Sequence, residues 1–302
     1  MLRYTLRQIE YAVAIWDHGS VAAASAHLGV AQPTLSASLA KLEAQIGLQL
    51  FIRHHAQGVS PSPAGLRFLG EARNLLTHAQ DLQRDTAAAG TAIEGQLALA
   101  SFATIAPSFV PPLIKGFMSQ HPKVTIRMAE GTQDELLKGV RSGDFDLALL
   151  YDVDMPDDFT VTPLASFAPH VLLPGKHKLT RLKNVPLIAL KDEPFVLLDI
   201  APSRTYFTRI LEGAGIVPNV AFSSPSLEVV RGLVGQGLGY SILVTRPFGD
   251  HSYAGEELAV RPIADEVARG VIALAALKQM RKTRLVSAFE AHCIDYFRNF
   301  IT

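Results

Sequence analysis

Two short helices joined by a tight turn are predicted near the start of the chain, and this pattern constrains the fold more than any other. Residues 20–28 predict a first helix, Gly29 ends it, and residues 32–47 predict a second. The second helix carries one apolar stripe, because its large apolar side chains are spaced by four, three and four residues. They are Leu35, Leu39, Leu42 and Ile46. Such a pair is typical of a helix-turn-helix, whose second helix lies in the major groove of DNA.

The face opposite this stripe is short and polar, which suits close approach to base edges. An earlier helix is expected to begin at Thr5, because Gln8 three residues later completes a capping box. A three-helix core of another kind would show similar stripes, so the pattern alone leaves that alternative open. The expected DNA-binding residues are Ser20, Gln32, Pro33, Thr34, Ser36, Ala37, Lys41, Arg53 and Ser60.

Residues 6–65 resemble the winged helix-turn-helix of the LysR-type transcriptional regulators in the order and spacing of their motifs. The matching pieces include Leu6-Arg7-Gln8, Gly19-Ser20, Ala23-Ala24, Gln32-Pro33, Leu35-Ser36, Leu42-Glu43, Leu50-Phe51, Gly58-Val59 and Ala64-Gly65. The resemblance implies an all-α winged helix-turn-helix N-terminal domain over residues 1–61. The family usually has arginine where Ala37 stands, so a potential bidentate contact to guanine is missing. Base recognition is therefore expected to depend on Gln32, Thr34, Ser36 and the wing.

A long helix is predicted after the wing, starting at Ser62-Pro63 and ending near Ala89. Its apolar residues repeat as a heptad seam over three repeats. Such a helix either packs on its own domain or pairs with a second copy, and the resemblance implies a linker helix that pairs. We expect this linker over residues 62–90, with dimer contacts from Phe68, Leu75 and Leu82.

Beyond this helix, strands and helices alternate to the end of the chain. The order strand, helix, strand, helix, strand predicts mainly parallel sheets covered on both faces. An apolar strand over residues 270–277 is expected to return to the first lobe. In the resembled family such lobes form a C-terminal α/β two-lobed, periplasmic-binding-protein-like effector domain. The expected limits are 91–302 for this domain, about 91–165 and 267–302 for lobe I, and about 166–266 for lobe II.

Hydroxyl-bearing residues follow several strands, at the points where helices begin. Ligands of open α/β sheets bind beyond the carboxyl ends of the strands, and helix N-termini there favour anions. Each Ser or Thr alone is explained as well by helix capping, but their recurrence at corresponding strand ends favours an effector site. A small-molecule effector, specifically an anion such as a carboxylate, is expected between the lobes. The residues expected to bind it are Ser101, Phe102, Thr104, Thr132, Pro202, Ser203, Arg204 and Ser226.

Composition excludes several other classes of protein. Lys and Arg total 28 and Asp and Glu total 28, so no global field attracts nucleic acid. The single cysteine, Cys293, excludes an internal disulfide and is expected to be a packed core thiol. No metal-ligand spacing, cofactor motif or catalytic constellation is found, so neither metal, cofactor nor enzyme activity is expected. No signal peptide or transmembrane segment is predicted, which favours a cytoplasmic protein that does not bind membranes.

Together these patterns predict a transcription regulator that binds double-stranded DNA at an interrupted palindrome. It is expected to act as a homodimer or as a homotetramer, because two reading helices spaced by dimer symmetry match two half-sites. Two alternatives share the α/β lobes. One is a solute-binding protein and the other is an α/β enzyme with an accessory helical domain. The first should carry a signal peptide and lack the helix-turn-helix.

Overall fold

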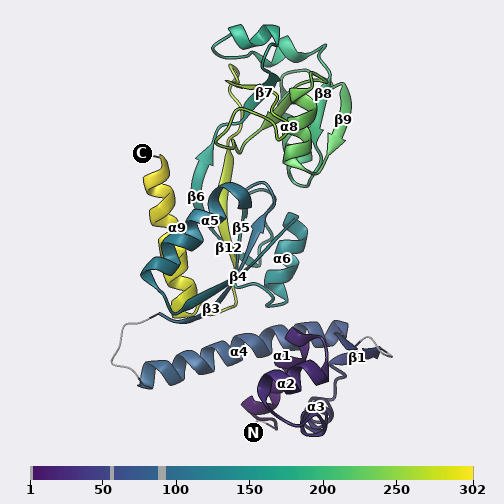
Figure 1. The fold of residues 1–302 in the computed structure, drawn as a ribbon, viewed down its shortest axis with the longest axis vertical. Helices are drawn as coiled ribbons and strands as arrows, with labels where there is room; N and C mark the ends of the chain where they lie inside the picture. Colours follow the sequence, from purple (N-terminus) through teal and green to yellow (C-terminus); the bar gives the residue numbers. More distant parts are fainter. Residues whose placement is uncertain (1–2, 55–57, 88–92, 302) are drawn as a thin grey trace.

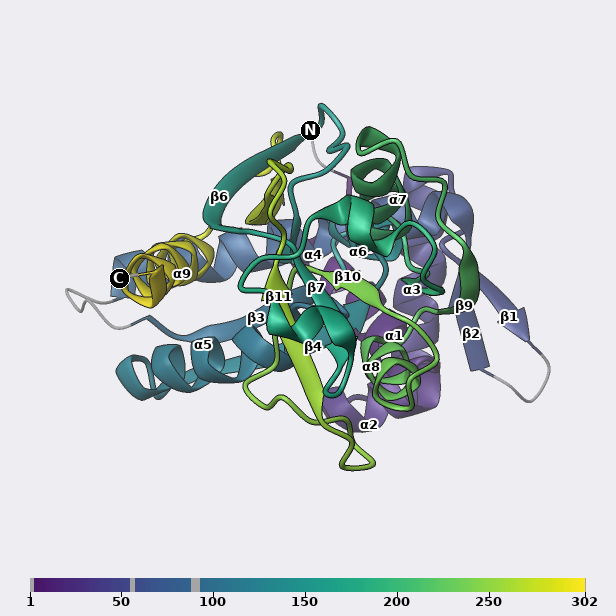
Figure 2. The ribbon, with the colours of Figure 1, turned by 90° about the horizontal axis from the view of Figure 1, so that it is seen from above.

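The structure is a computed structural model that describes residues 3–54, 58–87 and 93–301. Three parts follow one another along its longest axis (Figure 1). A helical N-terminal part and a long helix lie at one end, one α/β lobe lies in the middle, and a second α/β lobe lies at the other end. Figure 2, seen from above, shows the lobes stacked over the N-terminal helices.

The N-terminal part consists of three helices and a β-hairpin. Its elements are α1 (Leu6–His18), α2 (Val21–Leu28), α3 (Gln32–Ile46), β1 (Phe51–His54) and β2 (Gly58–Pro61). The strands β1 and β2 pair antiparallel and form the wing. The apolar stripe of α3 faces inward, because Leu35, Leu39 and Leu42 are buried in one core with α1.

Local capping explains where these helices begin and end. The capping box between Thr5 and Gln8 starts α1, as the sequence predicted. The Ser20 hydroxyl accepts a hydrogen bond from the Ala23 amide and starts α2. Gly19 and Gly29 end α1 and α2 in the left-handed conformation that glycine adopts at low cost. The helix-turn-helix spacing is therefore set by caps that are local in sequence.

The long helix α4 (Pro63–Ala87) follows the wing. The Ser62 hydroxyl accepts a hydrogen bond from the Gly65 amide, which confirms the predicted start at Ser62-Pro63. In Figure 1 this helix lies between the helix-turn-helix and the middle lobe. The predicted end of the linker, near residues 89–90, lies outside the described residues.

Lobe I is a five-stranded sheet in the order β4-β3-β5-β12-β6. Helices α5 and α9 cover one face and α6 covers the other (Figures 1 and 2). The elements are β3 (Gly95–Phe102), α5 (Ala106–Gln120), β4 (Val124–Gly131), α6 (Gln133–Arg141), β5 (Leu147–Tyr151), β6 (Phe159–Phe167), β12 (Gly270–Leu277) and α9 (Arg284–Ile301). The expectation that residues 270–277 return to lobe I is confirmed, because β12 pairs with β5 and β6.

Lobe II contains a three-stranded and a two-stranded sheet, in the orders β10-β7-β11 and β8-β9. A bridge between Phe195 and Tyr240 connects the two sheets. The elements are β7 (His170–Pro174), the short 3₁₀ helices η1 (Lys178–Arg181) and η2 (Leu187–Leu190), β8 (Phe195–Leu198), α7 (Ser203–Gly213), β9 (Val220–Ser224), α8 (Leu227–Gly235), β10 (Ser241–Leu243) and β11 (Leu258–Pro262).

The expectation of mainly parallel sheets is correct for β3, β4 and β5 and for the pair β8 and β9, but wrong for the other strands of the lobes. Strand β12 runs antiparallel to both of its neighbours, and β7, β10 and β11 form an antiparallel sheet. The physical reason is that β6 leaves lobe I and β12 returns to it, so the chain crosses twice between lobes. Strands β6 and β11 were not predicted, because neither shows the continuous apolar run of a buried strand.

One buried core extends through both lobes, and a separate core lies in the N-terminal part. Cys293 is buried among aromatic side chains of α9, as expected, and burial raises the pKa of its thiol. Within residues 3–54, 58–87 and 93–301, no helix combines the length and hydrophobicity needed to span a bilayer.

A buried histidine makes the free energy of unfolding depend on pH. Burial of His170 lowers its pKa from 6.5 to about 4, and the nearby guanidinium groups of Arg246 and Arg231 act in the same direction, with Asp250 opposing them. Between these pKa values the unfolded chain binds a proton that the folded chain does not, so stability falls as the pH falls from about 6.5 toward 4. We expect a loss of about 2 kcal/mol between pH 7.5 and pH 5.

Urea unfolding of the parent and of His170→Asn at both pH values measures this effect. Asparagine does not titrate, so its contribution to the free energy of unfolding should be the same at the two pH values. An equal pH dependence in the two proteins would show that His170 is not the responsible group.

Candidate DNA-binding and effector sites

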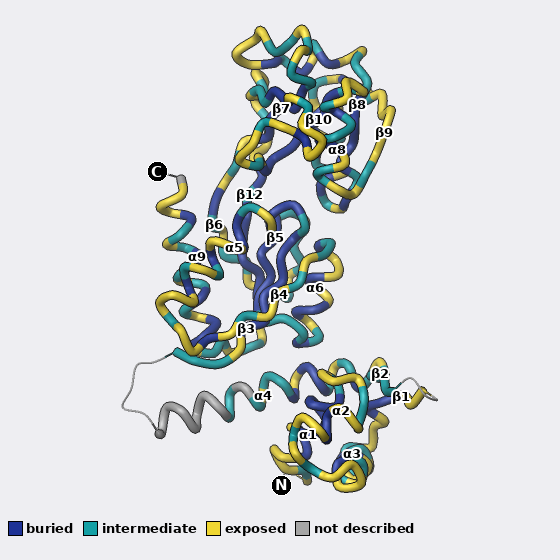
Figure 3. Tube along the Cα trace, in the orientation of Figure 1, coloured by how far each residue is buried: buried dark blue, intermediate teal, exposed yellow. Residues whose placement is uncertain are grey.

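The polar face of α3 is open to solvent (Figure 3). Gln32, Pro33, Thr34, Ala37 and Lys41 are exposed and Ser36 is half-buried, while the apolar stripe of the same helix is covered. The structure therefore places six of the expected DNA-binding residues on one accessible helical surface.

The amino end of α3 has no side-chain cap. Ala31 is the N-cap residue, and it forms no capping hydrogen bond, while Pro33 lies in the first turn. The amides of the first turn therefore have no capping side chain, and they carry the partial positive charge of the helix dipole. This end of the helix is suited to a DNA phosphate.

The wing is held close to the helix-turn-helix by backbone contacts. The Val59 amide donates a hydrogen bond to the Gly19 carbonyl at 2.9 Å. A Cβ atom on Gly58 would lie 2.4 Å from the same carbonyl oxygen, so this approach requires glycine. Arg53 is exposed on β1, and the Ser60 hydroxyl lies 2.7 Å from the His54 ring nitrogen Nε2. Both expected wing residues therefore lie on the hairpin, and Ser20 caps α2 close by.

Glu43 links α3 to the wing. Its Oε1 atom accepts hydrogen bonds from the amides of Leu50 and Phe51, at 2.7 and 3.3 Å. Because Leu50 and Phe51 are buried, this carboxylate sets the position of the first wing strand relative to the reading helix.

A cavity lies between the two lobes, with about 380 Å³ of unfilled space that includes its opening to solvent. Lobe I contributes the carboxyl end of β5 and the segment after β3, and lobe II contributes the start of α7 and the end of β10. The lining residues are Thr104, Tyr151, Val153, Leu198, Pro202, Ser203, Tyr206, Phe207, Leu243, Val244, Thr245 and Gly270. None of these lining side chains carries a charge, so a ligand here meets apolar walls and a few hydroxyl groups.

Tyr151 lies between hydroxyl groups of both lobes. Burial raises the pKa of its phenol to about 12, and hydrogen bonding with Thr104 and Thr245 opposes that rise. Thr104 belongs to lobe I and Thr245 to lobe II. Tyr151 is therefore neutral at physiological pH, and it lines the cavity together with a threonine from each lobe.

Three of the expected effector-binding residues line this cavity, namely Thr104, Pro202 and Ser203. Thr104 also lines a wider groove next to it, together with Ser226. Tyr151 and Phe207 line the cavity as well. The carboxyl ends of β3, β5 and β8 thus supply much of the lining, as the strand-end argument predicted.

The other expected effector-binding residues are not among those lining the cavity. Ser101 and Phe102 are buried in the lobe I core, where the Phe102 ring packs edge-on against Tyr151 at 5.7 Å between ring centroids. The side chain of Arg204 is 62% exposed and forms an ion pair with Asp199. The position of α7 thus turns this guanidinium away from the cavity.

Thr132 caps α6 through its own helix. Its amide and its hydroxyl both donate hydrogen bonds to Glu135, at 2.9 and 2.8 Å. These bonds lower the pKa of the Glu135 carboxyl, so it is ionised. A carboxylate of the protein therefore already occupies this helix N-terminus, which disfavours a second anion there.

Sequence reasoning missed Tyr206, Leu243, Thr245 and Gly270. Thr245 lies two residues after the end of β10, and the same position after β3 is the signal that found Thr104. Tyr206 and Gly270 give no local signal. They reach the cavity because α7 and β12 pack there. The Tyr206 hydroxyl donates a hydrogen bond to the Ala268 carbonyl, two residues before β12 begins.

The expected dimer seam is partly accessible on α4. The Leu75 side chain is 44% exposed, whereas Phe68 packs edge-on against Tyr4 at 6.2 Å and contacts the N-terminal core. The side chain of Leu82 lies outside the described residues.

Across the part of the chain that the structure describes, no three His, Cys, Asp or Glu side chains gather as a metal site would require.

Comparison with protein families gives two matches. A model described as "LysR substrate binding domain" matches residues 90–298. A model described as "Bacterial regulatory helix-turn-helix protein, lysR family" matches residues 6–66. The two matches cover most of the chain.

Individual proteins agree with these matches. The HTH-type transcriptional regulator YcgK of Bacillus subtilis is 30% identical over 258 residues, covering 78% of this chain and 79% of that protein. The structure of HinK, a LysR family transcriptional regulator from Pseudomonas aeruginosa, is similar with a TM-score of 0.68 at 42% identity, covering 97% and 98% of the two chains. A full-length OxyR variant from Pseudomonas aeruginosa is similar with a TM-score of 0.79 at 26% identity, covering 97% and 98%.

Proposed function

The chain belongs to the LysR-type transcriptional regulators, and we propose that it binds an interrupted DNA palindrome as a homodimer or a homotetramer. Like its relatives it is a DNA-binding regulator with an effector-binding domain, which disfavours a solute-binding protein or an enzyme. The proposed domain limits are those expected from the sequence, at residues 1–61, 62–90 and 91–302. Because its partner is DNA, we place it in the cytoplasm.

The exposed face of α3 is the observation that supports this DNA-binding mode. It presents Gln32, Thr34 and Ser36 to base edges. Lys41 lies further along the same helix, where it reaches a phosphate. The uncapped amino end of α3 offers a second phosphate contact. In residues 1–60, four cations stand against three acids, so two copies are needed to provide enough phosphate contacts.

Two substitutions on α3 should have different effects on DNA binding. Lys41→Ala removes a phosphate contact, so we expect weaker binding on all sequences and a shallower salt dependence. Gln32→Ala removes a base contact, so we expect a loss of about 1–3 kcal/mol at one base-pair position and a relaxed preference there. Binding curves at several salt concentrations, on a panel of single-base variants of a selected site, measure both effects.

Glu10→Gln serves as a matched control, because Glu10 is exposed on α1 and outside the proposed reading face. It should bind every member of the panel like the parent. Unchanged affinity and unchanged base preference in both α3 variants would contradict the assignment of α3 as the reading helix.

We further propose that the effector is a small molecule with an apolar body and one anionic or hydrogen-bond-accepting group, bound in the cavity between the lobes. The apolar body fits walls such as Phe207 and Leu243, and the polar group fits the hydroxyls of Thr104 and Ser203. Helix α7 begins at Ser203 without a side-chain cap, so its first amides also suit an anionic group. Arg204 and Thr132 take no part in this arrangement.

An effector held by both lobes binds their closed arrangement better than an open one, and this difference in affinity is what a switch requires. A thermal-shift screen of small organic acids, aromatic and aliphatic, identifies ligands that stabilise the folded chain. Thr104→Val keeps the shape of the cavity and removes one hydroxyl. A screen in which no acid stabilises the parent more than this variant would contradict the proposed cavity.

A further inference from the structure

The long helix α4 touches lobe I at two glycines. A Cβ atom on Gly70 would lie 1.8 Å from the carbonyl oxygen of Ser142, and one on Gly143 would lie 2.8 Å from the Gly70 Cα atom. Gly143 also has a φ of +75°, which other residues adopt at a cost. The backbone of the turn after α6 therefore rests directly on α4, and both positions require glycine.

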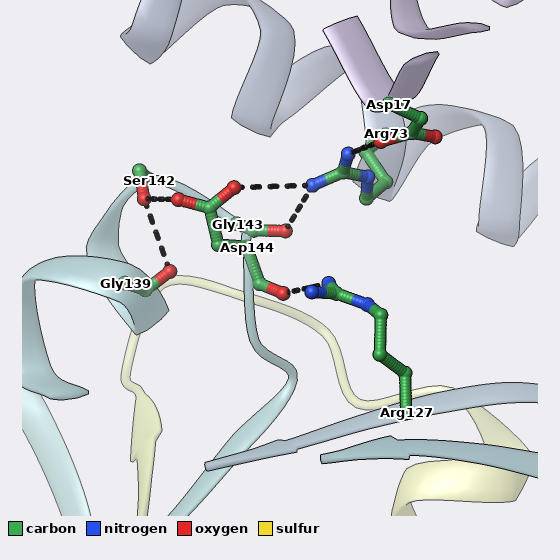
Figure 4. Close-up of polar contacts among 7 residues, drawn as sticks. All are labelled: Asp17, Arg73, Arg127, Gly139, Ser142, Gly143 and Asp144. Atoms are coloured by element: carbon green, nitrogen blue, oxygen red, sulfur yellow. Dashed lines mark hydrogen bonds and ion pairs between the residues drawn. The ribbon is translucent and has the colours of Figure 1, made fainter. Parts of the chain in front are cut away.

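Arg73 lies one turn further along α4 and binds both sides of this contact (Figure 4). Its guanidinium stacks on the Trp16 ring, 4.0 Å from the centroid, and forms an ion pair with Asp17, both on α1. Its Nη1 atom donates to the Gly143 carbonyl at 3.1 Å and lies 3.5 Å from Asp144 Oδ1. The side chain is only 21% exposed, so these charge pairs are partly shielded from solvent.

The turn that Arg73 holds is itself well ordered by hydrogen bonds. The Ser142 hydroxyl donates to Asp144 Oδ2 at 2.6 Å, and it also lies 3.1 Å from the Gly139 carbonyl. On the other side, Arg127 donates to the Asp144 carbonyl (Figure 4). Arg73 therefore binds a turn of lobe I whose conformation is fixed by its own hydrogen bonds.

The two elements that meet at this turn both extend to the cavity between the lobes. Helix α6 ends at the turn, and its nine residues span about 14 Å. At its other end the Gln133 side chain donates to the carbonyl of Val153, which lines the cavity, at 2.7 Å. Strand β5 begins just after the turn and ends at Tyr151, also in the lining. A shift at the cavity can therefore reach the turn through two short, packed elements.

We propose that Arg73 is the residue that couples the effector domain to the DNA-binding domain, by joining α1, α4 and the Ser142–Asp144 turn in one junction. Through this junction, a displacement of α6 and β5 moves the helix-turn-helix, and DNA bound to α3 in turn restrains α6 and β5. The reciprocity follows because coupling between two sites acts equally in both directions. The inference that an effector acts on DNA binding through this junction rests on the proposed effector cavity. The contacts of the junction itself do not depend on that cavity.

Hydrogen–deuterium exchange of the full-length protein tests this proposal without an effector. The probe is a DNA duplex selected by binding from a random pool. In the parent we expect the duplex to slow exchange over residues 32–46, which reports binding, and to change exchange over residues 142–151, which reports coupling. In Arg73→Met we expect the first effect to remain and the second to disappear. Methionine retains an apolar side chain over Trp16 but removes both ion pairs.

A second variant and a control separate the junction from other effects. Gly143→Ala adds a Cβ atom against α4 without changing charge, and should also abolish the change over residues 142–151. Lys138→Met, at an exposed position on α6 outside the junction, should behave like the parent. In the absence of DNA, both junction variants should exchange about fivefold faster or more over residues 142–146.

The proposal is overturned if Arg73→Met transmits the DNA-induced change as the parent does, or if the parent shows no such change. Loss of the protection over residues 32–46 in the parent would instead contradict the proposed reading helix. Ligand binding plays no part in the measurement, so a failure of the proposed effector cavity is seen separately, in the thermal-shift screen.

Discussion

Leu75→Glu is expected to convert the protein into a monomer and to lower its specific DNA affinity by about a thousandfold or more. The Leu75 side chain is 44% exposed on α4 in the single chain, which leaves it available to a second copy. In a dry interface between two helices, an unpaired carboxylate costs several kcal/mol. A monomer reaches one half-site only, so it loses half of the phosphate and base contacts.

Light scattering gives the oligomeric state, and binding to a duplex with two half-sites gives the affinity. Leu75→Met is the matched control, because methionine has a similar volume and stays apolar, and it should remain a dimer. The free energy of unfolding of each monomer should change little. A Leu75→Glu protein that remains fully dimeric would mean that α4 does not form the interface.

Ser203→Phe is expected to abolish the effector response while DNA binding without effector remains. Ser203 is buried at the start of α7 and lines the cavity between the lobes. A phenyl ring placed there occupies much of the space that the effector needs. The DNA-reading face lies in another part of the chain and keeps its core, so its affinity should be unaffected.

Calorimetry with an acid found in the thermal-shift screen measures the loss, and DNA binding with and without that acid measures the response. Ser203→Ala keeps the space and removes one hydroxyl, so it should lose about 1–2 kcal/mol of binding. Arg204→Ala is the neighbouring control, because that side chain is exposed and paired with Asp199, and it should bind like the parent. If Ser203→Phe binds the acid with parental affinity, the effector lies elsewhere.

The candidate sites were predictable to different degrees. The reading face of α3 followed from residues four or fewer positions apart, such as the spacing between Leu35 and Leu39 and the position of Pro33. These signals are local, and the structure keeps them because an α-helix has one period regardless of its surroundings. Within the cavity, Thr104 and Ser203 were predictable because strand ends in α/β sheets supply ligand-binding residues.

The remaining lining was not predictable from local patterns. Gly270 and Thr245 reach the cavity only because β6 and β12 cross between the lobes. The apolar run of β12 predicted a returning strand, but β6 leaves no distinctive signal. The antiparallel sheet of lobe II was missed for the same reason. The alternation of apolar and polar residues along a strand predicts which of its faces is buried. It does not predict whether the neighbouring strand runs parallel or antiparallel.

The sequence by itself determined the helix-turn-helix, its caps, the long helix and the alternation of the α/β lobes, since each depends on residues within one or two turns of one another. Only the tertiary structure decided where individual side chains point. It buried Ser101 in a core and brought Arg73 between Asp17 and Asp144, which lie 56 and 71 residues away in the chain. The reason is that such contacts depend on the packing of distant segments, and no local spacing encodes which segments will meet.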